Sequence, residues 1–209
     1  MDAAAATDIE EAQLTRWLFT GFAPSRQLAS QFGFAPGTKL YFGADPRTLR
    51  TDARGPGDID VLAIDLVRPE CALAIEVKRV KMPTDSYWTS LPNKLEGIDK
   101  GRKQVELLRQ IGFHRSYLLI AVVADGRERT DVNFASRGST PALIKTVRDK
   151  LSCLEFHPDV GVLVVEVTQP VDKNICDAGA VGIWTHQEGN PIPQHPGVTQ
   201  SVKNAQRGM

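Results

Sequence analysis

Residues 55–81 read GPGDIDVLAIDLVRPECALAIEVKRVK, and this stretch decides the expected fold. Its two apolar runs, 58–66 and 71–80, are rich in the Val, Ile, Leu and Ala residues of strands that bury at least one face. Only residues 67–70 separate the runs. A connection that short joins antiparallel neighbours, because a parallel pair needs a crossover of about a dozen residues or more. The stretch therefore predicts a β-hairpin.

Among the charged side chains of this apolar hairpin, four stand in a matching pattern: Asp58 and Asp60 in the first run, Glu76 and Lys78 in the second. Burying a charge without a partner is unfavourable, so the four need a shared explanation. Side chains alternate along a strand, which places each pair on one face, and pairing through the turn brings Asp60 near Glu76. Converging carboxylates suit Mg²⁺ or Mn²⁺. The lysine can orient or deprotonate a water, or stabilise an anionic transition state.

The rest of the chain predicts a mixed sheet with helices on its faces, an α/β fold. From residue 186 the chain is rich in Gln, Pro, Gly and Asn, so we expect one domain over 1–185 and a loose tail over 186–209. The expected helices are one starting at Thr7 or Asp8, then 24–28, 91–111 and 141–151, and the further strands are 38–42, 116–124, 160–167 and a weaker 180–184.

Composition is that of an ordinary globular protein. The 209 residues are 42% hydrophobic, and 25 basic residues balance 25 acidic ones, so no overall positive charge indicates nucleic acid. Basic residues nevertheless outnumber acidic ones between 76 and 115. The three cysteines lack metal-ligand spacing, and neither a signal peptide nor a long apolar run is present. We expect a cytoplasmic protein without a membrane partner.

Over about residues 8–124 the chain resembles the PD-(D/E)XK nuclease superfamily, whose restriction-endonuclease-like core runs helix, three strands, helix, strand. The resemblance assigns Asp60 to the motif aspartate, Glu76 to the acidic position and Lys78 to the lysine. The Pro-Asp position reads Gly57-Asp58 or Ile59-Asp60 here, so either aspartate can be the main metal ligand. Asp60 is preferred, because I-D-V-L followed at similar distance by E-V-K recurs in the family, and Asp58 is then a second or outer ligand.

The resemblance also implies two helical contributions to the site. Members often carry a metal-binding glutamate on the first helix, for which Glu10 and Glu11 both qualify and Glu11 is our candidate ligand. Members also place a glutamine or lysine on the helix after the motif, here Gln104 as a catalytic residue and Lys100. The implied activity is Mg²⁺- or Mn²⁺-dependent hydrolysis of phosphodiester bonds, by an endo- or exonuclease acting on DNA, with RNA as the other substrate. A homodimer is left open.

The local basic excess fits such a substrate, because phosphate contacts supply most non-specific affinity for nucleic acid. Tyr87 and Trp88 could stack on bases, although packing within their loop is the simpler interpretation for Trp88. A solvated helix face is the competing interpretation of the charges. The candidate phosphate-binding residues are Arg79, Lys81, Lys94, Lys100, Arg102 and Lys103, with Arg109 on the same helix.

Two other functions fit the same residues. Gly43-Ala44 precedes Asp58-Ile59-Asp60 at the distance found in nucleotidyltransferases, where Asp58, Asp60 and Glu76 would bind a metal-nucleotide complex. That reading ranks second, because Ala44 lacks the usual hydroxyl and Lys78 has no role. The third reading is a non-catalytic, nuclease-like binding module. It is disfavoured because a binding module has no need for buried acids.

Overall fold

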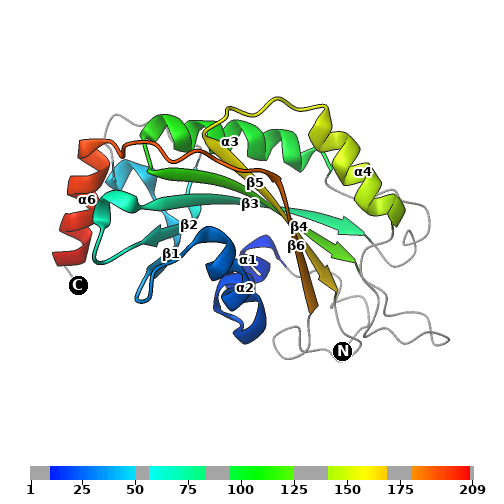
Figure 1. The fold of residues 1–209 in the computed structure, drawn as a ribbon, viewed down its shortest axis with the longest axis horizontal. Helices are drawn as coiled ribbons and strands as arrows, with labels where there is room; N and C mark the ends of the chain where they lie inside the picture. The colour runs from blue at the N-terminus through cyan, green and yellow to red at the C-terminus, as the bar shows by residue number, and fades with distance from the viewer. Residues whose placement is uncertain (1–9, 50–56, 83–94, 125–140, 169–179, 208–209) are drawn as a thin grey trace.

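The computed structural model describes residues 10–49, 57–82, 95–124, 141–168 and 180–207. These residues form an α/β protein with five helices and one mixed sheet of six strands (Figure 1). Among the described helices, none combines the length and the apolar character needed to cross a lipid bilayer.

The six strands lie side by side in chain order. The middle of the sheet, β3–β4–β5, is parallel, and both flanks, β1–β2–β3 and β5–β6, are antiparallel. The strands are β1 (Lys39–Ala44), β2 (Ile59–Ile64), β3 (Leu73–Met82), β4 (Arg115–Ala124), β5 (Val160–Thr168) and β6 (Ala180–Gln187).

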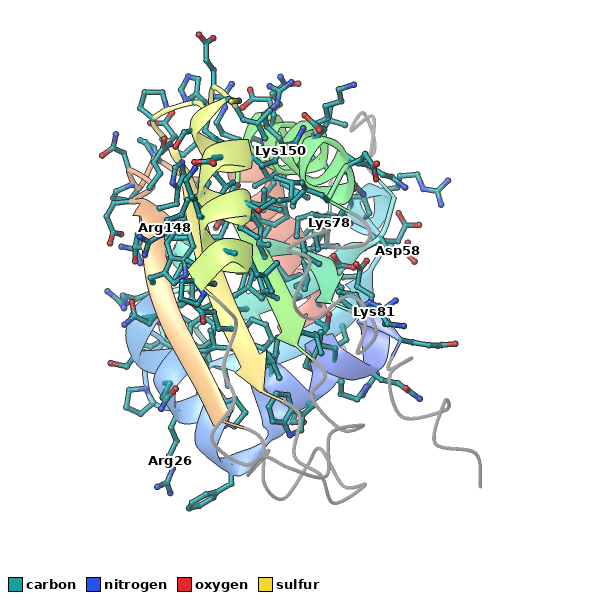
Figure 2. The ribbon with its side chains drawn as sticks, turned by 90° about the vertical axis from the view of Figure 1, so that its right-hand side faces the viewer. Arg26, Asp58, Lys78, Lys81, Arg148 and Lys150 are labelled. Carbon is teal, nitrogen blue, oxygen red and sulfur yellow. The ribbon has the colours of Figure 1, made fainter. Side chains whose placement is uncertain are left out.

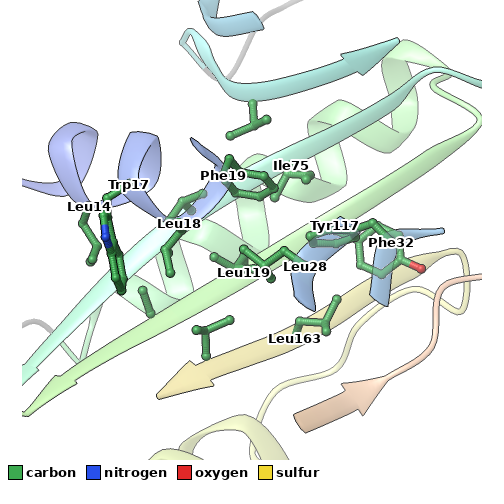
Figure 3. Close-up of a cluster of buried hydrophobic side chains, with 14 of the residues drawn as sticks. Leu14, Trp17, Leu18, Phe19, Leu28, Phe32, Ile75, Tyr117, Leu119 and Leu163 are labelled. Carbon is green, nitrogen blue, oxygen red and sulfur yellow. The ribbon is translucent and has the colours of Figure 1, made fainter. Parts of the chain in front are cut away.

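Helices cover both faces of this sheet (Figure 1). On one face, Leu14 and Leu18 of α1 and Phe32 of α2 pack on residues such as Ile75 and Tyr117 (Figure 3). On the other face, α3 and α4 cover β3, β4 and β5 through a second cluster, and α6 closes a third cluster beside α3 and β2. The helices are α1 (Glu11–Thr20), α2 (Phe22–Phe32), α3 (Gly97–Ile111), α4 (Pro141–Ser152) and α6 (Pro196–Arg207).

The expected hairpin is confirmed. β2 and β3 are antiparallel, with Val61 opposite Ile75, and a short 3-10 turn, η3 (Pro69–Cys71), lies in the connection. The glycine expected to end the following helix does so: Gly112 is left-handed at φ 95° and donates its N–H to the carbonyl of Arg109. The apolar run of β4 lies between two parallel neighbours with both faces covered, as expected.

The expected loose tail is wrong for the described part of 186–209. β6 continues to Gln187, and residues 196–207 form α6. Val198 and Val202, one helical turn apart, are fully buried against α3 and β2. The second helix is also longer than expected, Phe22–Phe32 instead of 24–28, and ends at the left-handed Gly33. The expected helix start at Thr7 or Asp8 and residues 91–94 of the third expected helix lie outside the described residues.

Candidate active site

The candidate site lies where β3 extends beyond the end of its pairing with β2. The pairing of the two strands ends at Val61 and Ile75, while β3 continues to Met82. Beyond that point, carboxylate oxygens instead of strand carbonyls accept backbone N–H groups of β3. Asp60 Oδ2 accepts the backbone N–H of Val77 at 2.7 Å, and Glu11 Oε2 accepts the N–H of Arg79 at 2.8 Å. Two acidic side chains from distant parts of the chain thus line one strand edge.

Glu76 and Lys78 complete this cluster from β3 itself. Lys78 Nζ donates to Glu76 Oε1 at 2.5 Å and lies 3.8 Å from Glu11 Oε1. The side chain of Glu76 is 1% exposed and that of Lys78 is 12% exposed. Three carboxylates therefore surround one ammonium group in a largely buried setting.

Burial shapes the electrostatics of this cluster. Loss of solvent and then the negative charge of Asp60 raise the pKa of Glu76 to about 7, against the opposing effect of Lys78. Burial likewise raises the pKa of Asp60, although the N–H of Val77 and the charge of Lys78 oppose the shift. For Lys78, burial favours the neutral amine, but Glu76, Glu11 and Asp60 together outweigh it and raise the pKa. Lys78 is therefore a stable ammonium group at neutral pH.

The donor set fits a hard divalent cation. The second carboxylate oxygen of Glu76, Oε2, is buried and has no hydrogen-bond partner among the described residues. Within those residues no group of three His, Cys, Asp or Glu side chains is arranged as a ready-made metal site. Mg²⁺, however, is usually held by one or two carboxylates together with waters and substrate phosphates. Asp60 and Glu76 meet that requirement, whereas Glu11 is turned to Lys78 and Arg79.

The structure separates the alternatives left open by the sequence. Glu11 reaches the cluster, while Glu10 is exposed at the N-cap of α1. Asp58 is exposed, and its charge acts on the guanidinium group of Arg47.

On α3, helical spacing places Gln104 between two inward-facing residues, Gly101 and Leu108, and its Oε1 is buried. Leu108 belongs to the cluster shared with β2, so this flank of α3 faces the strand that carries Asp60. Lys100, one turn before Gln104, is exposed. Both residues thus lie on one face of α3, and their roles stay predictions.

The expected phosphate-binding residues are scattered. Arg79 is 6% exposed and alternates to the α1 face of the sheet, opposite to Lys78. Arg102 points to the far flank of α3, where it lines a hollow with Phe156 and His157. Lys103 is exposed, and Lys81 is half-buried near the end of β3, on the side of the molecule that also carries Lys78 and Asp58 (Figure 2). Arg109 is paired with Glu106, and the candidates Lys94, Tyr87 and Trp88 lie outside the described residues.

The Gly43-Ala44 pair, on which the nucleotidyltransferase alternative depends, lies inside a strand. Gly43 and Ala44 end β1, Ala44 pairs with Ile59, and Gly43 is left-handed at φ 66°. The following described element is the short 3-10 helix η2 (Pro46–Thr48), in which Asp45 accepts the N–H of Arg47.

One residue beside Lys78 was not expected from the sequence to matter. Gly101 is buried in the interior of α3. Glycine at such a position destabilises a helix by roughly 0.5–1 kcal/mol relative to alanine, and that cost is the signal that could have identified it.

The concave surface near Asp65 lies away from this cluster. A hollow of about 320 Å³ opens at the other end of β2 and β3, and its lining includes Asp65, Arg68, Cys71 and Arg115. None of the clustered carboxylates lines it, so its size does not bear on the candidate site. Neither a protein-family model nor a curated protein matches this chain.

Proposed function

We propose that this protein is a metal-dependent nuclease that hydrolyses phosphodiester bonds in DNA, with RNA as the alternative substrate. The observation that carries the proposal is the cluster of Asp60, Glu76 and Lys78 at the free edge of β3, with one buried carboxylate oxygen of Glu76 left without a hydrogen-bond partner among the described residues. Buried polar groups are usually paired, and a bound cation would supply a partner for this carboxylate oxygen.

The order of elements supports a restriction-endonuclease-like fold for this site. α1, β1, β2, β3, α3 and β4 give the helix, three strands, helix, strand order of the PD-(D/E)XK core, with α2 inserted after α1. β5, α4, β6 and α6 are then additions around that core. In this arrangement the acidic residues come from adjacent strands, and the lysine follows the second acid on the same face.

Asp60 and Glu76 are the proposed ligands of Mg²⁺ or Mn²⁺. When bound, such an ion would polarise the scissile phosphate and lower the pKa of a coordinated water. The chain's own contribution is positioning and charge. Because the carboxylates keep Lys78 protonated, we assign it to holding the attacking water by hydrogen bonding, or to stabilising negative charge on the phosphate, and not to general-base catalysis. Glu11 is a second ion-pair partner of Lys78, with its Oε1 3.8 Å from Nζ.

The exposed Lys100 and Lys103 of α3, together with Lys81 of β3, are the described residues that we propose as phosphate contacts. Such contacts are independent of sequence, so we expect weak base preference and strong salt dependence.

A plasmid-nicking assay tests the proposal. The purified protein should nick supercoiled DNA with Mn²⁺ or Mg²⁺ and stop when EDTA is added. Glu76→Gln removes one proposed ligand at nearly constant volume and should abolish nicking. Glu106→Gln is the matched control, because Glu106 is held by Arg109 on another flank of α3, and it should cut normally. Nicking by Glu76→Gln at the wild-type rate would overturn the site assignment.

A further inference from the structure

Gly101 lies where any side chain would strike the candidate catalytic lysine. A Cβ built on Gly101 would lie 2.7 Å from Cγ of Lys78 and 2.7 Å from Cδ1 of Leu118, closer than real Cβ atoms approach their neighbours. Gly97 begins the same helix, and a Cβ there would meet nothing within 4 Å. The two glycines of α3 therefore serve different purposes.

The route of the Lys78 side chain explains the difference. Lys78 starts on β3 beneath α3, and its chain lies against Gly101 along at least Cγ and Cε, the latter 3.5 Å from the built Cβ. Its Nζ then reaches Glu76 and Glu11. Lysine side chains normally extend to solvent, yet this one is only 12% exposed, so the space between helix and strand sets its direction.

We propose that Gly101 is a positioning residue: the side chain it lacks opens the slot through which Lys78 brings its ammonium group onto the carboxylates. The catalytic consequence rests on the proposed nuclease function, but the positioning itself does not. The competing explanation is simple close packing of α3 on Leu118 of β4. Both explanations use the same glycine, so the test must separate Lys78 from Leu118.

Gly101→Ala is the test variant and Gly97→Ala the control. The first readout needs no activity: the rate at which Lys78 is reductively methylated by formaldehyde and cyanoborohydride, followed by peptide mass spectrometry. Gly101→Ala should raise this rate several-fold, because the displaced amine leaves its buried ion pairs, whereas Gly97→Ala should leave it unchanged. The second readout is plasmid cleavage, where kcat should fall about 100-fold with little change in KM, as expected for a misplaced catalytic group.

A second substitution separates the two explanations. Leu118→Ala, added to Gly101→Ala, relieves the contact with leucine but leaves the contact with Lys78. Lys78 should stay highly reactive in this double variant, and cleavage should stay slow. Return of both readouts to their values in the Leu118→Ala single variant would show that packing on Leu118 is the whole effect, and would overturn the proposal. So would an unchanged Lys78 methylation rate in Gly101→Ala.

Two further results have defined meanings. If wild-type protein cleaves no nucleic acid, the nuclease proposal fails, and the methylation rates still decide the role of Gly101. If Gly101→Ala does not fold, Lys78→Ala is added. Recovery of a cooperative thermal transition in that double variant supports a clash with Lys78, and failure to recover it overturns the proposal.

Discussion

Two aspartates at opposite ends of β2 show two uses of a carboxylate. Asp65 follows the strand, and Asp60 lies near its start. Asp65 is 7% exposed, and its oxygens accept the backbone N–H groups of Val67 and Arg68 and the guanidinium Nε of Arg68. Burial alone would raise its pKa, but these hydrogen bonds hold the pKa of Asp65 below its usual value. Asp60 has the opposite shift, because its burial is not fully compensated.

The opposite directions of these two pKa shifts distinguish a carboxylate that stabilises the fold from one that does not. Asp65 is most stable when charged, so its ionisation stabilises the native state. The cluster of Asp60 and Glu76 is strained by its own charge, with one oxygen of Glu76 unpartnered among the described residues. Groups that destabilise a protein in this way are concentrated at functional sites. The comparison therefore separates a turn-forming aspartate from a candidate metal ligand on the same strand.

The largest expected effect tests this separation directly. Asp60→Asn should lower the rate of DNA cleavage by about a thousandfold, because a divalent ion supplies several kcal/mol of transition-state stabilisation. Asp65→Asn should cleave at the wild-type rate. Both variants are measured in the same nicking assay, with circular dichroism to confirm folding. Equal losses in the two variants would remove the distinction between the two ends of β2.

A smaller effect is expected in the pH dependence of stability. Burial raises the folded-state pKa of Glu76 to about 7 from its ordinary value of 4.5, so between these two pH values the folded protein binds more protons than the unfolded chain. Its free energy of unfolding, measured with urea in metal-free buffer, should therefore fall by on the order of 2–3 kcal/mol between about pH 5 and pH 8.

Glu76→Gln should reduce this pH-dependent decrease in the free energy of unfolding, and Asp65→Asn should leave the decrease unchanged. The pKa of Asp65 is lowered, so its contribution is present above its ordinary value of 3.8 and is lost only as the pH falls below it. Wild-type stability that rises from pH 5 to pH 8 would contradict the assignment of Glu76 as a strained carboxyl group.

The smallest effect concerns the turn. Asp65→Ala removes the acceptor of two backbone N–H groups and one guanidinium, so it should lower the free energy of unfolding by about 1–3 kcal/mol. Thermal unfolding at neutral pH measures the change, and DNA cleavage below the melting range should persist. Asp60→Ala is the comparison, and we expect it to be less destabilising, because it also relieves repulsion with Glu76.

Local patterns in the sequence were enough for the hairpin and for two site residues. The short link at 67–70 leaves only an antiparallel pairing, and strand alternation by itself places Glu76 and Lys78 on one face. Neither inference needs long-range information. The end of α3 at Gly112 was predictable for the same reason, because a left-handed terminus is a local requirement.

Other features depend on how elements pack, which local patterns do not encode. The rotation of α3 about its own axis determines which flank packs on the sheet, so Gln104 faces β2 while Arg102 faces away. The lateral position of α1 decides that Glu11, and not its neighbour Glu10, reaches β3. The sequence did not predict α6, because Val198 and Val202 are the only large apolar side chains in its polar sequence. Two apolar residues are too few to indicate a helix by themselves, and they form its buried face only by packing on α3 and β2.

The position of α6 also means that the fold can be completed only after the C-terminal residues have been synthesised. The side chain of Gln194, just before α6, accepts the N–H of Ala72 and donates to the carbonyl of Pro69, so residues made late in synthesis complete a turn made early. Until they emerge from the ribosome, the apolar surface that receives Val198 and Val202, including Phe113, stays open to water and to other nascent chains. Such distant contacts slow folding and lengthen the time for which this surface is exposed to aggregation.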